Sequence, residues 1–166
     1  MNELEKLAER LGELLIDRGE WLAAAESCTG GWLAQSVTAI AGSSAWFDRG
    51  FVTYSNAAKI EMLGVPETTL ARHGAVSEAV ARAMAQGALT NSRADWALAI
   101  TGIAGPGGGS PQKPVGTVCF AWASKDGGCE ALTCQFTGDR AAVREKSVAF
   151  ALDGLLDRLG STAFLA

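Results

Sequence analysis

The sequence is poor in the side chains on which many catalytic sites depend. His73 is its only histidine, so any Ser-His or Cys-His scheme would have to use that one residue. Four cysteines are present without a C-x-x-C pair, and a zinc site would need scattered thiols. They are Cys28, Cys119, Cys129 and Cys134. We therefore expect no metal site and interpret these cysteines as reduced, mostly buried thiols.

Long apolar runs and an excess of basic residues are also missing. No apolar run approaches the roughly 20 residues that a membrane-spanning helix needs, and the opening MNELEKLAERLGELLIDRGEW is too acidic for a secretion signal. The net charge is -4, which gives no support for a nucleic-acid-binding surface. We expect one cytoplasmic domain over residues 1–166 that binds neither a membrane nor nucleic acid.

Apolar periodicity and turn residues predict the element order αβαβααβββα. The expected helices cover about 3–18, 30–40, 57–63, 66–74, 78–92 and 140–159, and the expected strands about 21–25, 46–54, 94–102, 117–124 and 130–138. The βαβ segments favour parallel pairing, whereas KDGG between the last two strands is typical of a hairpin. The expected fold class is α/β, with a mixed, mostly parallel sheet, a C-terminal antiparallel hairpin and helices covering the sheet.

Polar segments follow the three expected parallel strands, at about residues 26–31, 54–59 and 101–109. Ligands in such sheets gather beyond the carboxyl ends of the strands. Ser55 and Asn56 are both good caps for the helix over 57–63. With Asn56 as the cap, Lys59 would lie in the first turn, where the macrodipole opposes a cation by roughly 0.3–1 kcal/mol. This position and burial would both lower the pKa of Lys59 and suit it to act as a general base. The alternative is a lysine that projects into solvent.

Ser27 stands in AAAESCTGGWLA, between a strand and a helix. A serine needs a base to become a nucleophile, and with histidine scarce the amine of Lys59 is the economical partner. Backbone N–H groups of Cys28, Thr29, Gly30 and Gly31 could then hold a developing oxyanion. The alternative for Ser27 is a helix cap.

Ser44 is a second candidate nucleophile, although it precedes a strand and a simple topology puts it at the far end from Lys59. It could instead form a turn, or reach the site through a curl of the chain or a second copy. Tyr54 could donate to the leaving group or orient Lys59, or be an ordinary strand aromatic. Cys28 adjoins the site but has no obvious imidazole partner.

The segment TGIAGPGGGSPQKPVG is too rich in glycine to pack into a core and is long enough to be a functional loop. It matches neither a Walker A motif nor G-x-G-x-x-G and therefore carries no dinucleotide fingerprint. Its N–H groups, with Thr101, Gly102 and Gly105, could form an anion-binding nest. Arg140, at the start of the last helix, could bind phosphate or form a surface ion pair.

Four motifs occur in order: AESCTGG, GSSAWFDRGFVTYSNAAKIEMLGV, HGAVSE and TGIAGPGGGS followed by KPVGTV. With them, about residues 5–158 resemble the CinA C-terminal domain family, and within it the stand-alone nicotinamide-nucleotide amidases. The resemblance implies that nicotinamide mononucleotide is hydrolysed to nicotinate mononucleotide and ammonia by a Ser/Lys dyad, without metal or cofactor. It matches the lysine to Lys59 and includes Tyr54. It leaves Ser27 and Ser44 open, and the strand-end argument favours Ser27.

The residues leave three other classes open. One is a non-catalytic module that binds a pyridine nucleotide and docks on a partner. Another is a structural or oligomerisation domain, since the five tryptophans could line an interface. The third is a cysteine hydrolase that uses Cys28. Assembly into several copies is likewise left open.

Overall fold

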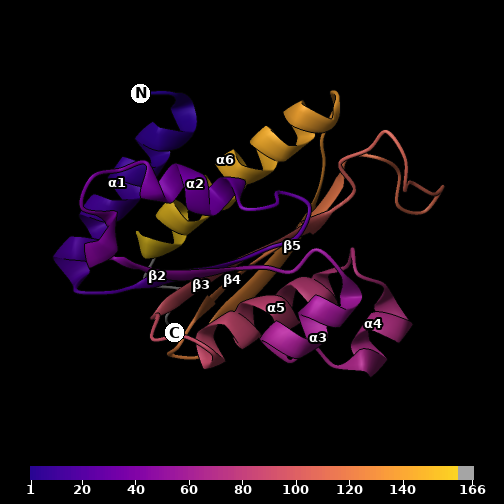
Figure 1. The fold of residues 1–166 in the computed structure, drawn as a ribbon, viewed down its shortest axis with the longest axis horizontal. Coiled ribbons are helices and arrows are strands. Elements are labelled where there is room, and N and C mark those ends of the chain that lie inside the picture. The colour runs from indigo at the N-terminus through magenta and orange to yellow at the C-terminus, as the bar shows by residue number, and fades with distance from the viewer. Residues whose placement is uncertain (161–166) are drawn as a thin grey trace.

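A five-stranded sheet lies between two layers of helices in the computed structural model, which describes residues 1–160 (Figure 1). The strand order is β2-β1-β3-β4-β5. The strands are β1 (Leu22–Glu26), β2 (Phe47–Val52), β3 (Trp96–Gly102), β4 (Thr117–Ser124) and β5 (Cys129–Gln135). β1 pairs in parallel with β2 and β3, whereas β4 is antiparallel to both β3 and β5. The predicted mixed sheet with its C-terminal hairpin is confirmed.

Helices lie on both faces of the sheet (Figure 1). One layer holds α1 (Glu3–Arg18), α2 (Trp32–Thr38) and α6 (Arg140–Leu159), and the other α3 (Asn56–Leu63), α4 (Glu67–His73) and α5 (Glu78–Thr90). Side chains of β1 alternate between the two cores, with Leu22 and Ala24 in one and Ala23 and Ala25 in the other. Burial on both faces explains why this strand reads as a continuous apolar run.

Helix caps set the start of the elements that carry the candidate site. The Ala58 N–H donates to Ser55 Oγ at 3.0 Å, so Ser55, the first of the two caps that the sequence offers, caps α3. Lys59 is consequently the fourth residue of this helix. Asp139 caps α6 as the sequence indicates, because its side chain accepts from the Ala142 N–H at 2.9 Å.

Close packing fixes α6 against the sheet. The Trp122 indole N–H donates to the Ala151 carbonyl at 3.0 Å, and a Cβ added at Gly154 would collide with the same indole ring. On α1 a Cβ at Gly12 would lie 2.6 Å from the ring of Trp46, which is itself buried. Missing side chains thus let two tryptophans seat directly against these helices.

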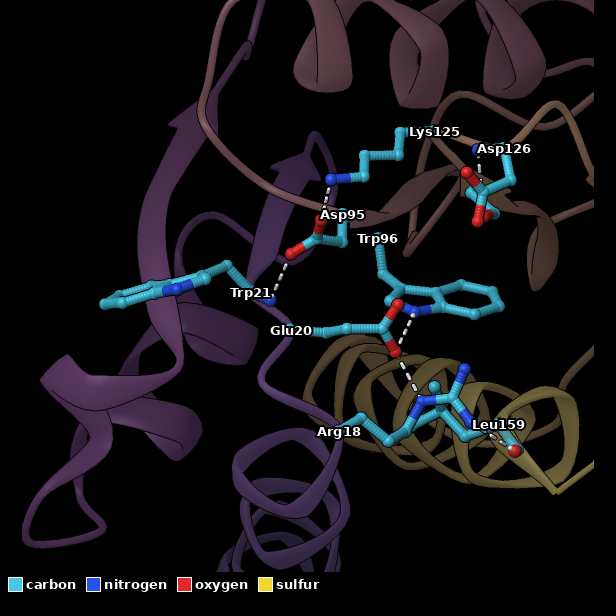
Figure 2. A network of polar contacts seen from close by, with 9 residues as sticks. Arg18, Glu20, Trp21, Asp95, Trp96, Lys125, Asp126 and Leu159 are labelled. Atoms are coloured by element: carbon cyan, nitrogen blue, oxygen red, sulfur yellow. Dashed lines mark hydrogen bonds and ion pairs between the residues drawn. The ribbon is translucent and has the colours of Figure 1, made fainter.

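A polar network joins the amino-terminal ends of β1 and β3 to the helices (Figure 2). Asp95 accepts from the Trp21 N–H at 2.7 Å and forms an ion pair with Lys125. Glu20 accepts from the Trp96 indole N–H at 3.2 Å. Arg18 at the end of α1 forms an ion pair with Glu20 and donates to the Leu159 carbonyl. We call this set, Arg18, Glu20, Trp21, Asp95, Trp96 and Lys125, the strand-start network.

Candidate active site

The carboxyl ends of the three parallel strands lie together at one edge of the sheet. Ser27 comes directly after β1, and its N–H donates to the Ile100 carbonyl of β3 at 3.0 Å. The Thr53 N–H after β2 donates to the Glu26 carbonyl at 2.8 Å. The parallel ladder therefore continues just past the strands, and the segments after β1, β2 and β3 lie together there.

Lys59 and Ser27 come into contact at this edge. Lys59 Nζ lies 3.0 Å from Ser27 Oγ and donates to the Thr53 carbonyl at 2.9 Å. The lysine is 2% exposed although its first-turn position in α3 already disfavours a cation. Burial lowers its pKa below the ordinary 10.5, while the neighbouring Cys28 thiol acts weakly in the opposite direction. The solvent-facing alternative for Lys59 is wrong, because the structure buries its amine beside two uncharged oxygens.

The turn that carries Ser27 is built around a buried carboxylate. Glu26 accepts from the Thr29 hydroxyl at 2.6 Å and from the N–H groups of Leu33 and Ala34 at 2.9 and 3.0 Å. Its negative charge therefore satisfies N–H groups at the amino terminus of α2. The residue before that helix, Gly31, has no side chain that could cap it. Ser27 does not serve as the cap of α2.

A cavity of about 230 Å³ opens beside Ser27. Its lining consists of Ser27, Cys28, Tyr54, Arg140 and glycine-rich segments, namely Gly102, Ile103, Ala104, Gly105, Gly107 and Gly108. Arg140 donates to the Gly105 carbonyl at 2.8 Å and to the Tyr54 hydroxyl at 2.7 Å. It therefore joins the glycine-rich loop to the segment after β2, in place of the surface ion pair that the sequence left open.

Several residues that the sequence put forward lie outside this cavity. Ser44 is exposed in a short 3-10 helix, Ser43–Ala45, before β2, and thus at the other end of that strand from Lys59. Thr101 is buried and donates its hydroxyl to the Ala75 carbonyl at 2.8 Å, because adjacent residues of β3 face opposite ways and Gly102 takes the cavity side.

The two glycines of the Ser27 turn also lie outside the cavity lining. Gly30 and Gly31 have φ of 58° and 102°, a left-handed conformation that favours glycine. Thr29 is fully buried by its bond to Glu26. These three positions shape the turn, and only their backbone could face a ligand.

Cys28 and His73 are poorly placed to replace the serine and lysine. Burial is the main effect that raises the pKa of the Cys28 thiol to about 11, so little thiolate forms at neutral pH. His73 lines a separate hollow of about 660 Å³ between α3, α4 and α5. That larger hollow contains neither Ser27 nor Lys59. Within residues 1–160 no three His, Cys, Asp or Glu side chains gather as a metal site requires.

Arg144 is a residue of this region that the sequence reading missed. Its Nε donates to the Cys28 carbonyl at 3.0 Å and its Nη2 to the Thr29 carbonyl at 3.1 Å. Its guanidinium also lies over the Trp32 ring, 5.5 Å from the centroid. The spacing of four residues from Arg140 puts both arginines on one face of α6, and that spacing was the available signal.

Comparisons with known proteins identify the family of the chain. The family model for the CinA C-terminal domain matches residues 4–159. The chain belongs to the CinA C-terminal domain family. Two relatives of this family member carry the name nicotinamide-nucleotide amidohydrolase PncC. The one from Escherichia coli strain K12 is 59% identical and the one from Shigella flexneri 58% identical, each over 93% of both chains.

A solved structure of the family has the same fold. The competence/damage inducible protein CihA from Agrobacterium tumefaciens superposes with a TM-score of 0.93 at 46% identity, covering 97% of this chain and 98% of that one. No helix among the described residues combines the length and apolarity needed to cross a membrane.

Proposed function

We propose that the chain hydrolyses the carboxamide of nicotinamide mononucleotide to nicotinate mononucleotide and ammonia, with Ser27 as nucleophile and Lys59 as general base. The observation that carries the proposal is the 3.0 Å contact between Ser27 Oγ and a buried amine with a lowered pKa, beside a cavity. The names of the amidohydrolase relatives supply the substrate.

The proposed first step uses the neutral form of Lys59. A neutral amine has two N–H groups and one lone pair, so Nζ can donate to the Thr53 carbonyl while accepting the Ser27 proton. As that proton moves to Nζ, Ser27 Oγ attacks the carboxamide carbon and its π electrons move to the oxygen. The result is a tetrahedral intermediate and a protonated Lys59.

Collapse of this intermediate releases ammonia. Protonated Lys59 gives its proton to the amide nitrogen, the C–N bond breaks, and Ser27 is left as an ester. Lys59, neutral again, takes a proton from water, whose oxygen attacks the ester carbon. The second intermediate then expels Ser27 Oγ, which recovers its proton from Lys59. The carboxylic acid that forms loses its proton to solvent and leaves as the carboxylate.

Backbone N–H groups of the Ser27 turn are the proposed donors to the oxyanion. Those of Gly30 and Trp32 already donate to the carbonyls of Ser27 and Thr29, both at 3.0 Å. This narrows the proposed donors to the N–H groups of Cys28, Thr29 and Gly31. One such donor is typically worth ~10²–10³ in rate.

The phosphate of the nucleotide is proposed to bind near Arg140. Its guanidinium lines the cavity, and the backbone of Gly102 and Gly105 lies beside it. Arginine is well suited to phosphate because its planar fork can donate two parallel hydrogen bonds. The same loop provides N–H groups without side chains in the way.

An ammonia-release assay tests the proposal. The wild-type chain is expected to release ammonia from nicotinamide mononucleotide, and Ser27→Ala to lose about 10²–10⁴ in kcat. Ser44→Ala is the matched control and should keep the wild-type rate. Mass analysis after rapid quenching should show an acyl group on the peptide that contains Ser27. A wild-type chain that binds the nucleotide without releasing ammonia would overturn the proposal in favour of a binding module.

A further inference from the structure

Helix α6 contacts all three segments that surround the candidate cavity. Its first residue, Arg140, bonds the Gly105 carbonyl after β3 and the Tyr54 hydroxyl after β2. One turn later, Arg144 bonds two carbonyls of the turn after β1. No step of the proposed reaction uses Arg144, and its contacts therefore need a separate explanation.

The guanidinium of Arg144 donates hydrogen bonds to the carbonyls of two consecutive peptide groups. Nε and Nη2 donate to the carbonyls of Cys28 and Thr29 at 3.0 and 3.1 Å. Since each peptide group is planar and trans, the N–H of Thr29 and that of Gly30 point away from the arginine. The Gly30 N–H then meets the Ser27 carbonyl at 3.0 Å and closes the turn.

Gly30 of the turn lies beside the arginine. Gly30 has φ of 58°, and a Cβ added there would lie 3.4 Å from Arg144 Nη2. Trp32 supports the guanidinium with its ring face. Two successive left-handed glycines make the turn flexible in isolation, because glycine loses more conformational freedom on ordering than any other residue.

We propose that Arg144 is a positioning residue that holds the Ser27 turn in the conformation that keeps Ser27 Oγ in reach of Lys59 Nζ. This inference rests on the proposed function. Arg144 acts on the turn and not on the base, because Lys59 is held by the Thr53 carbonyl on a different segment. Misplacing a reacting atom by about 1 Å can cost 10²-fold in rate. Binding of the nucleotide elsewhere in the cavity should change little.

The test compares Arg144→Met with Arg144→Lys and with a matched control on the same helix. Arg158 also lies over a tryptophan ring, that of Trp122, and donates to a main-chain carbonyl, that of Gly154. Its remaining hydrogen bond goes to Glu130 and not to the Ser27 turn. Arg158→Met therefore controls for the loss of an arginine packed on an aromatic ring. All variants are assayed for kcat, KM, the pH dependence of kcat, and the rate at which a sulfonyl fluoride labels Ser27.

For Arg144→Met we expect kcat to fall by about 10–10²-fold, with KM changed by less than about threefold and the apparent pKa of the base unchanged. Labelling of Ser27 should slow in parallel. Arg144→Lys should recover part of the loss, because an ammonium can donate to these carbonyls without the rigid fork. Arg158→Met should lower the melting temperature and leave kcat and labelling at wild-type values.

Three results would overturn the inference. One is an unchanged kcat and labelling rate in Arg144→Met while the wild type turns over. Another is an equal loss of kcat in Arg158→Met, which would make the effect one of general stability. A wild-type chain inert toward both the nucleotide and the reagent would remove the proposed function and this inference together. If labelling of Ser27 depends on Arg144 but no ammonia is released, only the proposed substrate is wrong.

Discussion

Charged side chains have opposite kinds of surroundings at the two ends of the parallel strands. At the amino-terminal end, the strand-start network matches Arg18 with Glu20 and Lys125 with Asp95 (Figure 2). At the carboxyl end, Lys59 is buried against a hydroxyl and a carbonyl. Opposite charges in contact stabilise both ions, whereas a buried amine beside uncharged oxygens is pushed toward neutrality. The first arrangement suits structure and the second suits proton transfer.

A cavity also distinguishes one end from the other. The carboxyl end has a turn with two left-handed glycines and a cavity walled by a glycine-rich loop. The amino-terminal end joins its strands to the ends of α1 and α6 through side-chain bonds. Left-handed glycines also occur at the amino-terminal end, at Gly19 and Gly42, so the carboxyl end is distinguished by the cavity that its glycines line.

The largest expected effect is that of Lys59→Met. Removing the proposed base should lower kcat for ammonia release by about 10²–10⁴-fold, while the apolar replacement fits the buried position and preserves the fold. Lys125→Met removes a lysine from the opposite end and should leave kcat unchanged. Wild-type turnover in Lys59→Met would break the comparison at its most important point.

Asp95→Ala should have its effect on stability instead. The Trp21 N–H and Lys125 would both lose their acceptor, and the free energy of unfolding should drop by about 1–2 kcal/mol with kcat unaffected. Urea denaturation measures the loss, and Asp126→Ala, an exposed carboxylate in the hairpin turn, is the control. A large loss of kcat in folded Asp95→Ala would show that the two ends are coupled.

The pKa of Lys59 should lie below the ordinary lysine value of 10.5, and the pKa of Lys125 above it. Burial lowers the pKa of Lys59, whereas the hydrogen bond with Asp95 raises that of Lys125. Because only neutral Lys59 can accept the serine proton, kcat should rise with pH up to the lowered pKa and fall about tenfold per unit below it. Carbon NMR of labelled lysine side chains would measure both values. A Lys59 that titrates at or above 10.5 would contradict the assignment of the base.

Cys28→Ala is the smallest expected change within the site. The thiol is buried with a pKa of about 11, and its side chain takes no part in the proposed reaction. We expect kcat within about threefold of the wild type, with a modest loss of stability from the vacated volume. Steady-state kinetics of Cys28→Ala and Ser27→Ala distinguish the two nucleophiles. Loss of turnover in Cys28→Ala with turnover retained in Ser27→Ala would favour a cysteine hydrolase instead.

Sequence patterns were sufficient for the frame of the molecule. Caps such as Asp139 and the apolar strands follow local rules, and the shared edge of parallel strands led to the pairing of Ser27 with Lys59. Long-range side-chain contacts could not be predicted from the sequence. Arg144 lies 115 residues from Thr29 along the chain, and no local pattern reports such a bond.

Side-chain direction accounts for the residues that the sequence misplaced. Thr101 and Gly102 are neighbours on β3, yet only the glycine borders the cavity. The Thr29 hydroxyl donates to Glu26, which leaves only the Thr29 N–H as a candidate donor to a ligand. A shift by one position on a strand reverses the face, so spacing alone identifies the edge of the sheet but not the side chains that point into the cavity.

The burial of Lys59 has a consequence for the heat of unfolding. When the chain unfolds, this amine returns to water and to an ordinary pKa of 10.5. Between the lowered native pKa and that value, unfolding must draw a proton from the buffer, and native stability accordingly increases with pH through the same window. Calorimetric enthalpies recorded in buffers that differ in ionisation heat would then diverge in proportion to the protons taken up.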